Sequence, residues 1–377
     1  MGIIIALLIF GLIVTVHEFG HFICAKLSNI KVMEFSIGMG PKLLQKRTGE
    51  TAYSLRARPV GGYCAMAGED EITDDERGFR SAKLWKRMIV LVAGAAMNFI
   101  LGFVLLIIMV CMMSDVPTTV VEEFALYKDS SGEIHYAAKS YETGLQYGDQ
   151  IISMDGTRIF STLDLNYMFA TTTSSTHDLV VKRDGKRVEL SDVEFYNENN
   201  GSTLDFGLVY KTKNPVTVVK GAGDLFMSMG HIVGLSLKQM VTGKLSKDDV
   251  SGPVGVVSAI NETAQESESM ADAVFNLLYM AALITINVGI FNLLPIPGLD
   301  GGRLLFCFIE LVRRKPVKPE HEGYVHLAGM ILLFGIMLFA TYNDIARLIT
   351  EHFAHNKKEE LWTKSLSSPT VRRSPAQ

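Results

Sequence analysis

Four long apolar segments dominate the hydrophobic pattern of the chain. Each is near or above the roughly 20 residues that a helix needs to cross the hydrocarbon core of a membrane. Most helices of a soluble protein carry a polar face, whereas residues 91–113 and 331–340 are apolar on all sides. The pattern therefore predicts a membrane α-helical protein with four transmembrane helices, at residues 2–27, 88–113, 271–294 and 325–349.

The segments between these helices have patterns of their own. Residues 34–68 alternate apolar and polar positions between turn-forming glycines, which predicts a small β-sheet between helices one and two. Residues 120–213 alternate in the same way at lower hydropathy and predict one compact domain. Residues 214–270 are amphipathic or polar and are expected at the membrane surface. Membrane cores at 1–119 and 271–352 and a disordered tail at 353–377 complete the predicted organisation.

The distribution of basic residues predicts the orientation. Lysines and arginines are concentrated in the loops between helices one and two and between helices three and four, whereas the stretch after helix two is acidic. Cytoplasmic loops of membrane proteins carry the excess of Lys and Arg, so both termini and the region between helices two and three should lie outside the cytoplasm. The near-neutral net charge of -4 argues against a nucleic-acid partner.

The first apolar segment contains ionisable residues. His17 and His21 are spaced i and i+4, so a helix places both imidazoles on one face within reach of one metal ion, and Glu18 lies beside them to take a proton from water. A carboxylate inside a membrane costs about 2.5 to 3.5 kcal/mol, which packing alone would not justify. A secretory signal would have no reason to carry these residues, and no basic residue precedes the run. We therefore expect a retained helix that binds zinc.

A catalytic zinc ion usually has three protein ligands, so another His, Asp or Glu must come from a distant position. Asp300 is the leading candidate because it follows helix three, where prolines end the helix and glycines allow the backbone to approach the metal closely. On spacing alone, a solvated Asp in an ordinary helix-ending turn is an alternative of nearly equal weight. Glu310, His321 and His326 are rival third ligands.

Together these motifs resemble the site-2 protease family of intramembrane metalloproteases. The resemblance is carried by HEFGH at residues 17–21 and NLLPIPGLDGG at 292–302. Where relatives usually carry Gly-Pro-x-x-Asn in the second helix, this chain departs from the pattern and has Gly94, Ala95, Ala96, Met97 and Asn98. Shorter strings also resemble bacterial members that act in regulated intramembrane proteolysis, at residues 35–41, 59–63, 79–83 and 252–255.

This resemblance implies that His17, His21 and Asp300 bind zinc. Glu18 would then be the general base, and Asn292 would hold the unwound substrate strand. Because residues 141–152 are similar to the loop and strand of a PDZ domain, the domain between helices two and three is expected to be an extracytoplasmic PDZ-like α+β domain. One such domain is typical of the bacterial branch, which implies a bacterial plasma membrane. Substrates would be trimmed single-span membrane proteins, such as anti-sigma factors or signal-peptide remnants.

Two functions of other classes remain open. A membrane scaffold could keep the fold and the PDZ-like domain without hydrolysis, although the intact Glu18 argues against it. A metal transporter would need further ionisable residues along its helices, and helices two and four are almost free of them. The scaffold is the stronger of the two alternatives.

Overall fold

Four long apolar helices form the membrane part of the computed structural model. They are α1 (Gly2–Leu27), α2 (Leu84–Met112), α7 (Met270–Leu293) and α9 (Pro319–Ser367). Among the described residues, these are the four helices long and apolar enough to cross a membrane, with Pro319–Thr350 as the spanning part of α9. The prediction of four such helices in a multi-pass membrane protein is confirmed. The structure describes residues 2–69, 74–124, 126–128, 134–136, 138–172, 174–195, 197–198, 201–202, 204–243 and 252–367.

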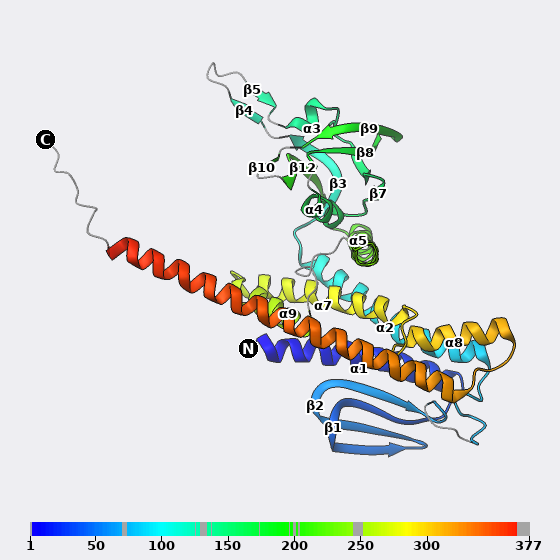
Figure 1. Ribbon diagram of the computed structural model, residues 1–377. Coiled ribbons are helices and arrows are strands. Elements are labelled where there is room, and N and C mark those ends of the chain that lie inside the picture. Colours follow the sequence, from blue (N-terminus) through cyan, green and yellow to red (C-terminus); the bar gives the residue numbers. More distant parts are fainter. Residues whose placement is uncertain are drawn as a thin grey trace.

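Helix α2 packs against both α1 and α7 (Figure 1), and small residues lie at these contacts. A Cβ atom added to Gly20 of α1 would lie 2.3 Å from the carbonyl oxygen of Ala93 in α2. A Cβ atom on Gly289 of α7 would lie 2.6 Å from the ring of Phe99 in α2. Lipid tails are as apolar as leucine, so close approach at small residues is what holds helices together in a membrane.

The loop between α1 and α2 forms a β-hairpin of β1 (Val32–Thr48) and β2 (Thr51–Met66). It curls back on itself, because Ile37 pairs with Gly62 on one side and with Leu55 on the other. The predicted small sheet is therefore present. It is not detached from the helices, since a Cβ atom on Gly11 in the middle of α1 would lie 2.2 Å from the carbonyl oxygen of Pro59.

Residues 115–212 form a separate α+β domain. Its strands β3, β6, β7, β8, β9 and β12 form one antiparallel sheet in the order β12-β3-β6-β8-β9, with β7 beside β6. The core is its own and includes Leu145, Ile151 and Met154. The domain starts earlier than residue 120, because Asp115 already pairs with Thr212. Its elements are β3 (Asp115–Phe124), β4 (Leu126–Lys128), β5 (Ile134–Tyr136), α3 (Lys139–Glu142), β6 (Gln150–Met154), β7 (Thr157–Arg158), α4 (Thr162–Thr171), β8 (Thr176–Arg183), β9 (Lys186–Glu194), β10 (Asn197–Glu198), β11 (Gly201–Ser202) and β12 (Phe206–Thr212).

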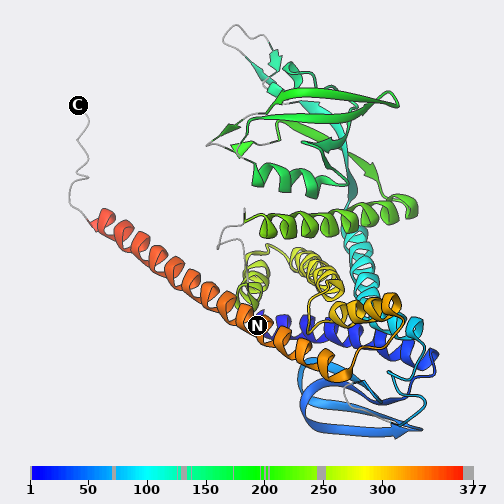
Figure 2. The ribbon, with the colours of Figure 1, turned by 45° about the vertical axis from the view of Figure 1, so that its right-hand side comes forward.

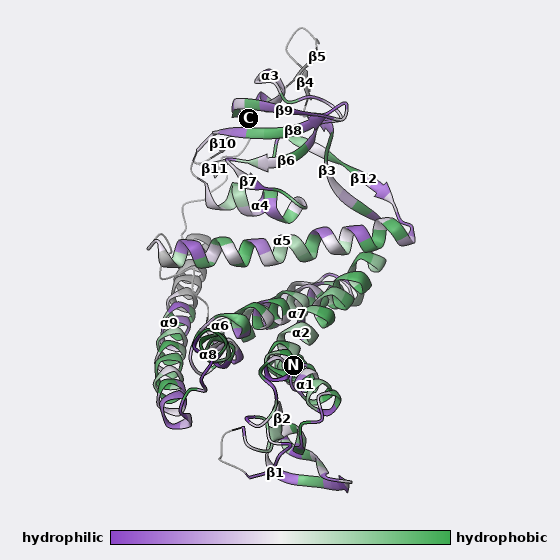
Figure 3. Ribbon diagram, turned by 90° about the vertical axis from the view of Figure 1, so that its right-hand side faces the viewer, coloured by the Kyte–Doolittle hydropathy of each residue, from purple (hydrophilic) through white to green (hydrophobic). Residues whose placement is uncertain are grey.

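Helix α5 (Pro215–Val241) lies between this domain and the apolar helices (Figures 2 and 3). On one side Phe226 contacts the rings of Phe99 and Phe103 in α2. On the other side the Ser228 hydroxyl donates a hydrogen bond to Asp164 of α4. The predicted amphipathic region thus consists of α5 and α6 (Pro253–Glu266), and its place at the membrane surface stays a prediction.

Helix α9 contacts the rest of the protein at several places along its length, and it packs closely against backbone at two of these contacts. A Cβ atom on Gly329 would lie 2.1 Å from the carbonyl oxygen of Pro297. Further along, the buried Asp344 accepts hydrogen bonds from the N–H groups of Gly252 (3.1 Å) and Gly255 (2.7 Å) at the start of α6. A carboxylate is favourable there because the N-terminal N–H groups of a helix lack partners within the helix.

The predicted disordered tail is partly wrong. Residues 353–367 continue helix α9 without a break. The Lys, Glu, Ala and Leu residues of this stretch have high helix propensity, which favours continuation of the helix over disorder. Residues 368–377 lie outside the described residues.

Candidate metal centre

Two imidazoles and one carboxylate from opposite ends of the chain meet at one point. The Nε2 atoms of His17 and His21 on α1 are 3.1 Å apart. Oδ2 of Asp300 lies 2.9 Å from the first and 3.2 Å from the second. Both histidines are buried. Within the described part of the chain, this is the one group of His, Cys, Asp and Glu side chains arranged to hold a metal ion.

The donor set fits a catalytic zinc ion. Four tetrahedral ligands at about 2.1 Å from zinc are about 3.4 Å from one another, which is close to the 2.9 to 3.2 Å separations found here. Two imidazole nitrogens and one carboxylate oxygen also leave the fourth position open, as a catalytic site requires.

Asp300 is the first residue of α8 (Asp300–Arg313) and not part of a loop. The glycines after it serve the packing of the preceding loop rather than approach to a metal. A Cβ atom on Gly301 would lie 2.0 Å from the carbonyl oxygen of Leu294, and one on Gly302 would lie 2.6 Å from that of Ile296. The loop before Asp300 thus packs directly against the first turn of α8 and fixes the position of that turn beside the two histidines.

The three rival ligands lie elsewhere. Glu310, at the far end of α8, accepts a hydrogen bond of 2.9 Å from the Arg87 guanidinium of α2. His326 of α9 accepts the N–H of Gly298 through Nδ1 at 2.9 Å, so it supports the loop before Asp300. His321 is exposed. None of the three belongs to the group at His17.

The two imidazoles rest against the backbone of α2. A Cβ atom on Gly94 would lie 2.5 Å from Nε2 of His21 and 2.7 Å from Nε2 of His17, so no side chain fits there. Nδ1 of His21 donates to the carbonyl oxygen of Val90 at 2.8 Å. The side-chain amide of Asn98 lies 3.1 Å from Nδ1 of His17. Hydropathy and spacing do not mark Val90 or Gly94 as part of the centre, and the one signal in the sequence is a polar Asn98 in an otherwise apolar helix.

Glu18 faces a cavity beside the histidines. Its Oε2 atom accepts the backbone N–H of Cys64 in β2 at 2.9 Å, so the hairpin fixes the carboxylate. The cavity has a volume of about 280 Å³. Asn292 lies on its wall, and its side-chain NH₂ donates to the carbonyl oxygen of Val288 at 2.9 Å. The lining residues are Val14, His17, Glu18, Val288, Asn292, Gly298, Leu299 and Asp300.

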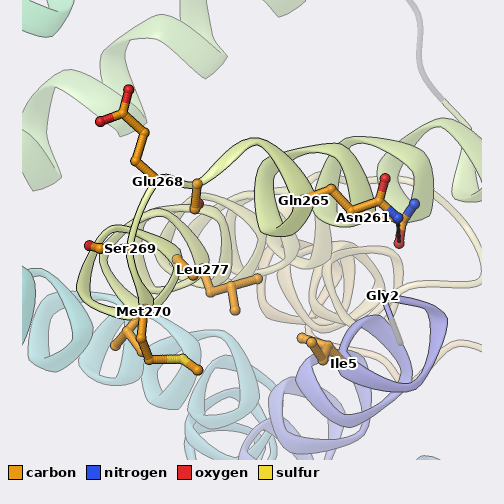
Figure 4. A pocket seen from close by; sticks show the side chains of 11 residues that line it. Gly2, Ile5, Asn261, Gln265, Glu268, Ser269, Met270 and Leu277 are labelled. Atoms are coloured by element: carbon orange, nitrogen blue, oxygen red, sulfur yellow. Dashed lines mark hydrogen bonds between the residues drawn. The ribbon is translucent and has the colours of Figure 1, made fainter.

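A larger cavity, of about 460 Å³, lies at the other end of α1 (Figure 4). Gly2 lines it, and His17 lies 15 positions after Gly2, which corresponds to about 22 Å of helix. The one titratable residue among its lining is Glu268, which points away from the other lining residues (Figure 4). Among the described residues that line it, none directs a metal-binding group into this cavity.

Known proteins with zinc protease activity in their names resemble the chain over nearly its whole length. The sequence profile of Peptidase family M50 matches residues 5–336. A putative zinc metalloprotease of Clostridium acetobutylicum is 34% identical over 347 residues, which cover 91% of this chain and 97% of the relative. The regulator of sigma-W protease RasP of Bacillus subtilis is 30% identical over 430 residues, which cover 92% of this chain and 98% of the relative.

Proposed function

The chain belongs to peptidase family M50, the zinc-dependent site-2 proteases, and on this premise we propose that it hydrolyses peptide bonds within or near the transmembrane segments of other membrane proteins. It is a zinc metalloendopeptidase with several membrane-spanning helices. The observation that carries the proposal is the meeting of His17, His21 and Asp300 beside Glu18 in one cavity.

The residues of the cavity have separate roles in this proposal. When bound, zinc supplies a Lewis acid that polarises the scissile carbonyl and lowers the pKa of water. His17 and His21 would hold it through Nε2, and Asp300 through Oδ2. Glu18 takes a proton from the attacking water and passes it to the leaving amine. The backbone N–H of Cys64 donates a hydrogen bond to one carboxylate oxygen of Glu18. This bond fixes the orientation of the other oxygen, which takes part in the proton transfer.

The substrate must reach the cavity as an extended strand. A carbonyl inside a transmembrane helix is bonded to the helix itself, so the segment has to unwind before it can react. Asn292 on the cavity wall and strand β2 beside Glu18 are placed to hold such a strand. Asn292 therefore acts in substrate binding in our proposal.

We further propose that both termini and the α+β domain lie outside the cytoplasm of a bacterial cell. The basic loops support this orientation. Figure 1 is consistent with it, because the hairpin and the α+β domain lie on opposite sides of the apolar helices. The relatives reported above come from bacteria, which supports a bacterial plasma membrane as the location.

The substrates we propose are single-span membrane proteins whose outer part has already been removed. RasP of Bacillus subtilis is named as a regulator of sigma-W, and by analogy anti-sigma factors or signal-peptide remnants are suitable substrates. The PDZ-like domain would exclude proteins that still carry a bulky outer domain.

A substitution of Glu18 tests this function. The Glu18→Gln protein should retain its zinc and lose cleavage of a single-span substrate, because the amide cannot accept a proton. Glu268→Gln is the matched control and should change neither property, since Glu268 lies at the other end of α1. Cleavage at the normal rate by Glu18→Gln would contradict the proposal, and a wild-type protein that binds zinc but cuts nothing would favour the scaffold.

A further inference from the structure

We propose that Asn98 is a positioning residue that holds His17 in the tautomer able to bind zinc, with the amide oxygen of Asn98 facing the ring. The inference rests on the metal-binding role proposed for His17. It concerns a residue that touches neither substrate nor metal, and it assigns a function to the one polar side chain in the middle of α2 that contacts the centre.

The His17 ring is fixed between two polar neighbours. On one edge, Nδ1 lies 3.1 Å from the side-chain amide of Asn98, which is fully buried. On the other edge, Nε2 lies 2.9 Å from Oδ2 of Asp300 and 3.1 Å from Nε2 of His21. A neutral imidazole carries one proton, so the partner of Nδ1 decides whether Nε2 has a free lone pair.

Only one orientation of the amide suits a metal site. If the NH₂ group of Asn98 faces the ring, Nδ1 must accept, and the ring proton moves to Nε2, where it blocks the metal. In that orientation Oδ1 of Asn98 is also buried without a hydrogen-bond partner among the described residues, so no other contact holds the amide in it. If Oδ1 faces the ring, it accepts the Nδ1 proton and Nε2 is free. The two ends of an amide have nearly the same shape, so the packing permits both.

The tautomer of His21 is fixed by a hydrogen bond of the same kind, and in this case the acceptor cannot become a donor. Its Nδ1 donates to the carbonyl oxygen of Val90, and a carbonyl can only accept. The backbone of α2 therefore fixes the tautomer of His21. Asn98, eight residues after Val90 on the same helix, does so for His17 through its side chain. Hydrogen bonds of this kind to metal-binding histidines orient the ring and raise metal affinity.

Two substitutions of Asn98 distinguish the effect of its hydrogen-bond acceptor from the effect of its size. Asn98→Asp keeps an oxygen acceptor in either protonation state, whereas Asn98→Leu keeps the size and removes the acceptor. The measurement is the zinc dissociation constant of the full-length protein in detergent, by competition with a chelating dye. We expect Asn98→Leu to weaken zinc binding by about 10- to 100-fold and Asn98→Asp to stay within about threefold of the wild type.

Thr285→Val is the control. Thr285 is buried beside the same residue, but its hydroxyl donates to the backbone oxygen of Asn98 at 3.3 Å and not to the side chain. Zinc affinity should be unchanged in this variant, which shows that loss of a nearby buried hydrogen bond is not sufficient.

Three results would overturn the inference. Asn98→Leu could bind zinc as tightly as the wild type, Asn98→Asp could lose as much affinity as Asn98→Leu, or Thr285→Val could weaken binding equally. If Asn98→Leu does not fold, the Asn98→Asp protein decides, since a tenfold loss there contradicts an acceptor role. A wild-type protein without zinc would instead contradict the proposed function itself, so the two failures are distinguishable.

Discussion

The metal centre and the α+β domain are constructed in opposite ways. The centre is assembled from α1, α2 and α8, which are far apart in the sequence, and it is held by contacts that exclude even one methyl group at Gly94. The domain is one continuous stretch with its own core, and it contributes no residue to the lining of the cavity at Glu18. We conclude that the chemistry depends on helix packing in the membrane, whereas the domain can act on substrate selection independently.

Among changes that leave the ligands and Glu18 in place, the largest effect should come from the packing of α2 on the histidines. In Gly94→Ala the new methyl group would lie 2.5 Å from Nε2 of His21, so either the ring or the helix must move. Overpacking of this kind costs about 1 to 3 kcal/mol, which corresponds to a loss of zinc affinity of roughly 5- to 150-fold. Zinc titration and cleavage of a model substrate would measure it.

Gly335→Ala is the matched control for that substitution. Gly335 also lies in a membrane-spanning helix, but a Cβ atom there would meet nothing within 4 Å. Its zinc affinity and activity should equal those of the wild type. Equal zinc affinity in both alanine variants would show that the contact of α2 with the centre is not essential.

Removal of the α+β domain should have a smaller effect on peptide hydrolysis and a clear effect on which substrates are cleaved. Asp115 and Thr212 are paired neighbours, about 5 Å apart across the two strands, so a short Gly-Ser linker can replace the domain. We expect bound zinc and cleavage of a trimmed substrate to persist within about twofold, because the ligands come from α1 and α8. Substrates with an intact outer domain should now be cut.

This comparison requires one membrane protein, with and without its outer domain, and both enzyme forms at equal abundance. An unchanged preference for the trimmed substrate would show that the domain is not the filter. Loss of zinc would show that the domain and the centre are not independent.

The smallest predicted effect is a loss of stability of the β1–β2 hairpin at low pH. Burial would raise the pKa of Glu34, but hydrogen bonds from Ser54 and Arg56 outweigh it and lower the pKa from 4.5 to about 2. A carboxylate with a lowered pKa stabilises the folded state above its unfolded pKa, and this stability is lost as the pH falls from about 4.5 towards 2. Relative to the intrinsic exchange rate at each pH, hydrogen exchange of the hairpin should therefore accelerate several-fold between about pH 5 and about pH 3.

Glu34→Gln is the control for the pH experiment. It removes the titrating group and shares any loss of metal at low pH, so its hairpin should show a smaller acceleration. The same acceleration in both proteins would assign the effect to groups other than Glu34.

The sequence predicted those features that local patterns specify. Each membrane helix is recognisable because a run of about 20 apolar residues has few alternatives. The spacing of His17 and His21 requires only the geometry of a helix. Asp300 was chosen over three rivals because it follows the end of an apolar helix, and the structure brings it to the histidines. Its role as a ligand remains our proposal.

Features that depend on contacts between distant segments were not predictable in this way. The fold-back of the hairpin against Gly11 depends on a contact with Pro59, and the pairing of Glu310 with Arg87 joins residues more than 200 positions apart. Nothing local marks Gly94 as the surface on which the imidazoles rest. Such contacts are set by tertiary packing, which hydropathy and spacing do not describe.

The zinc content of the purified protein tests the central claim most directly. Wild type and Glu310→Ala should each hold one zinc ion per chain, and Asp300→Ala should lose most of it together with cleavage, because the site then retains only two ligands. Asp300→Glu should recover partial function at best, since the longer side chain displaces the ligand oxygen. A full zinc complement in Asp300→Ala, with loss of zinc in Glu310→Ala, would contradict the metal centre described above.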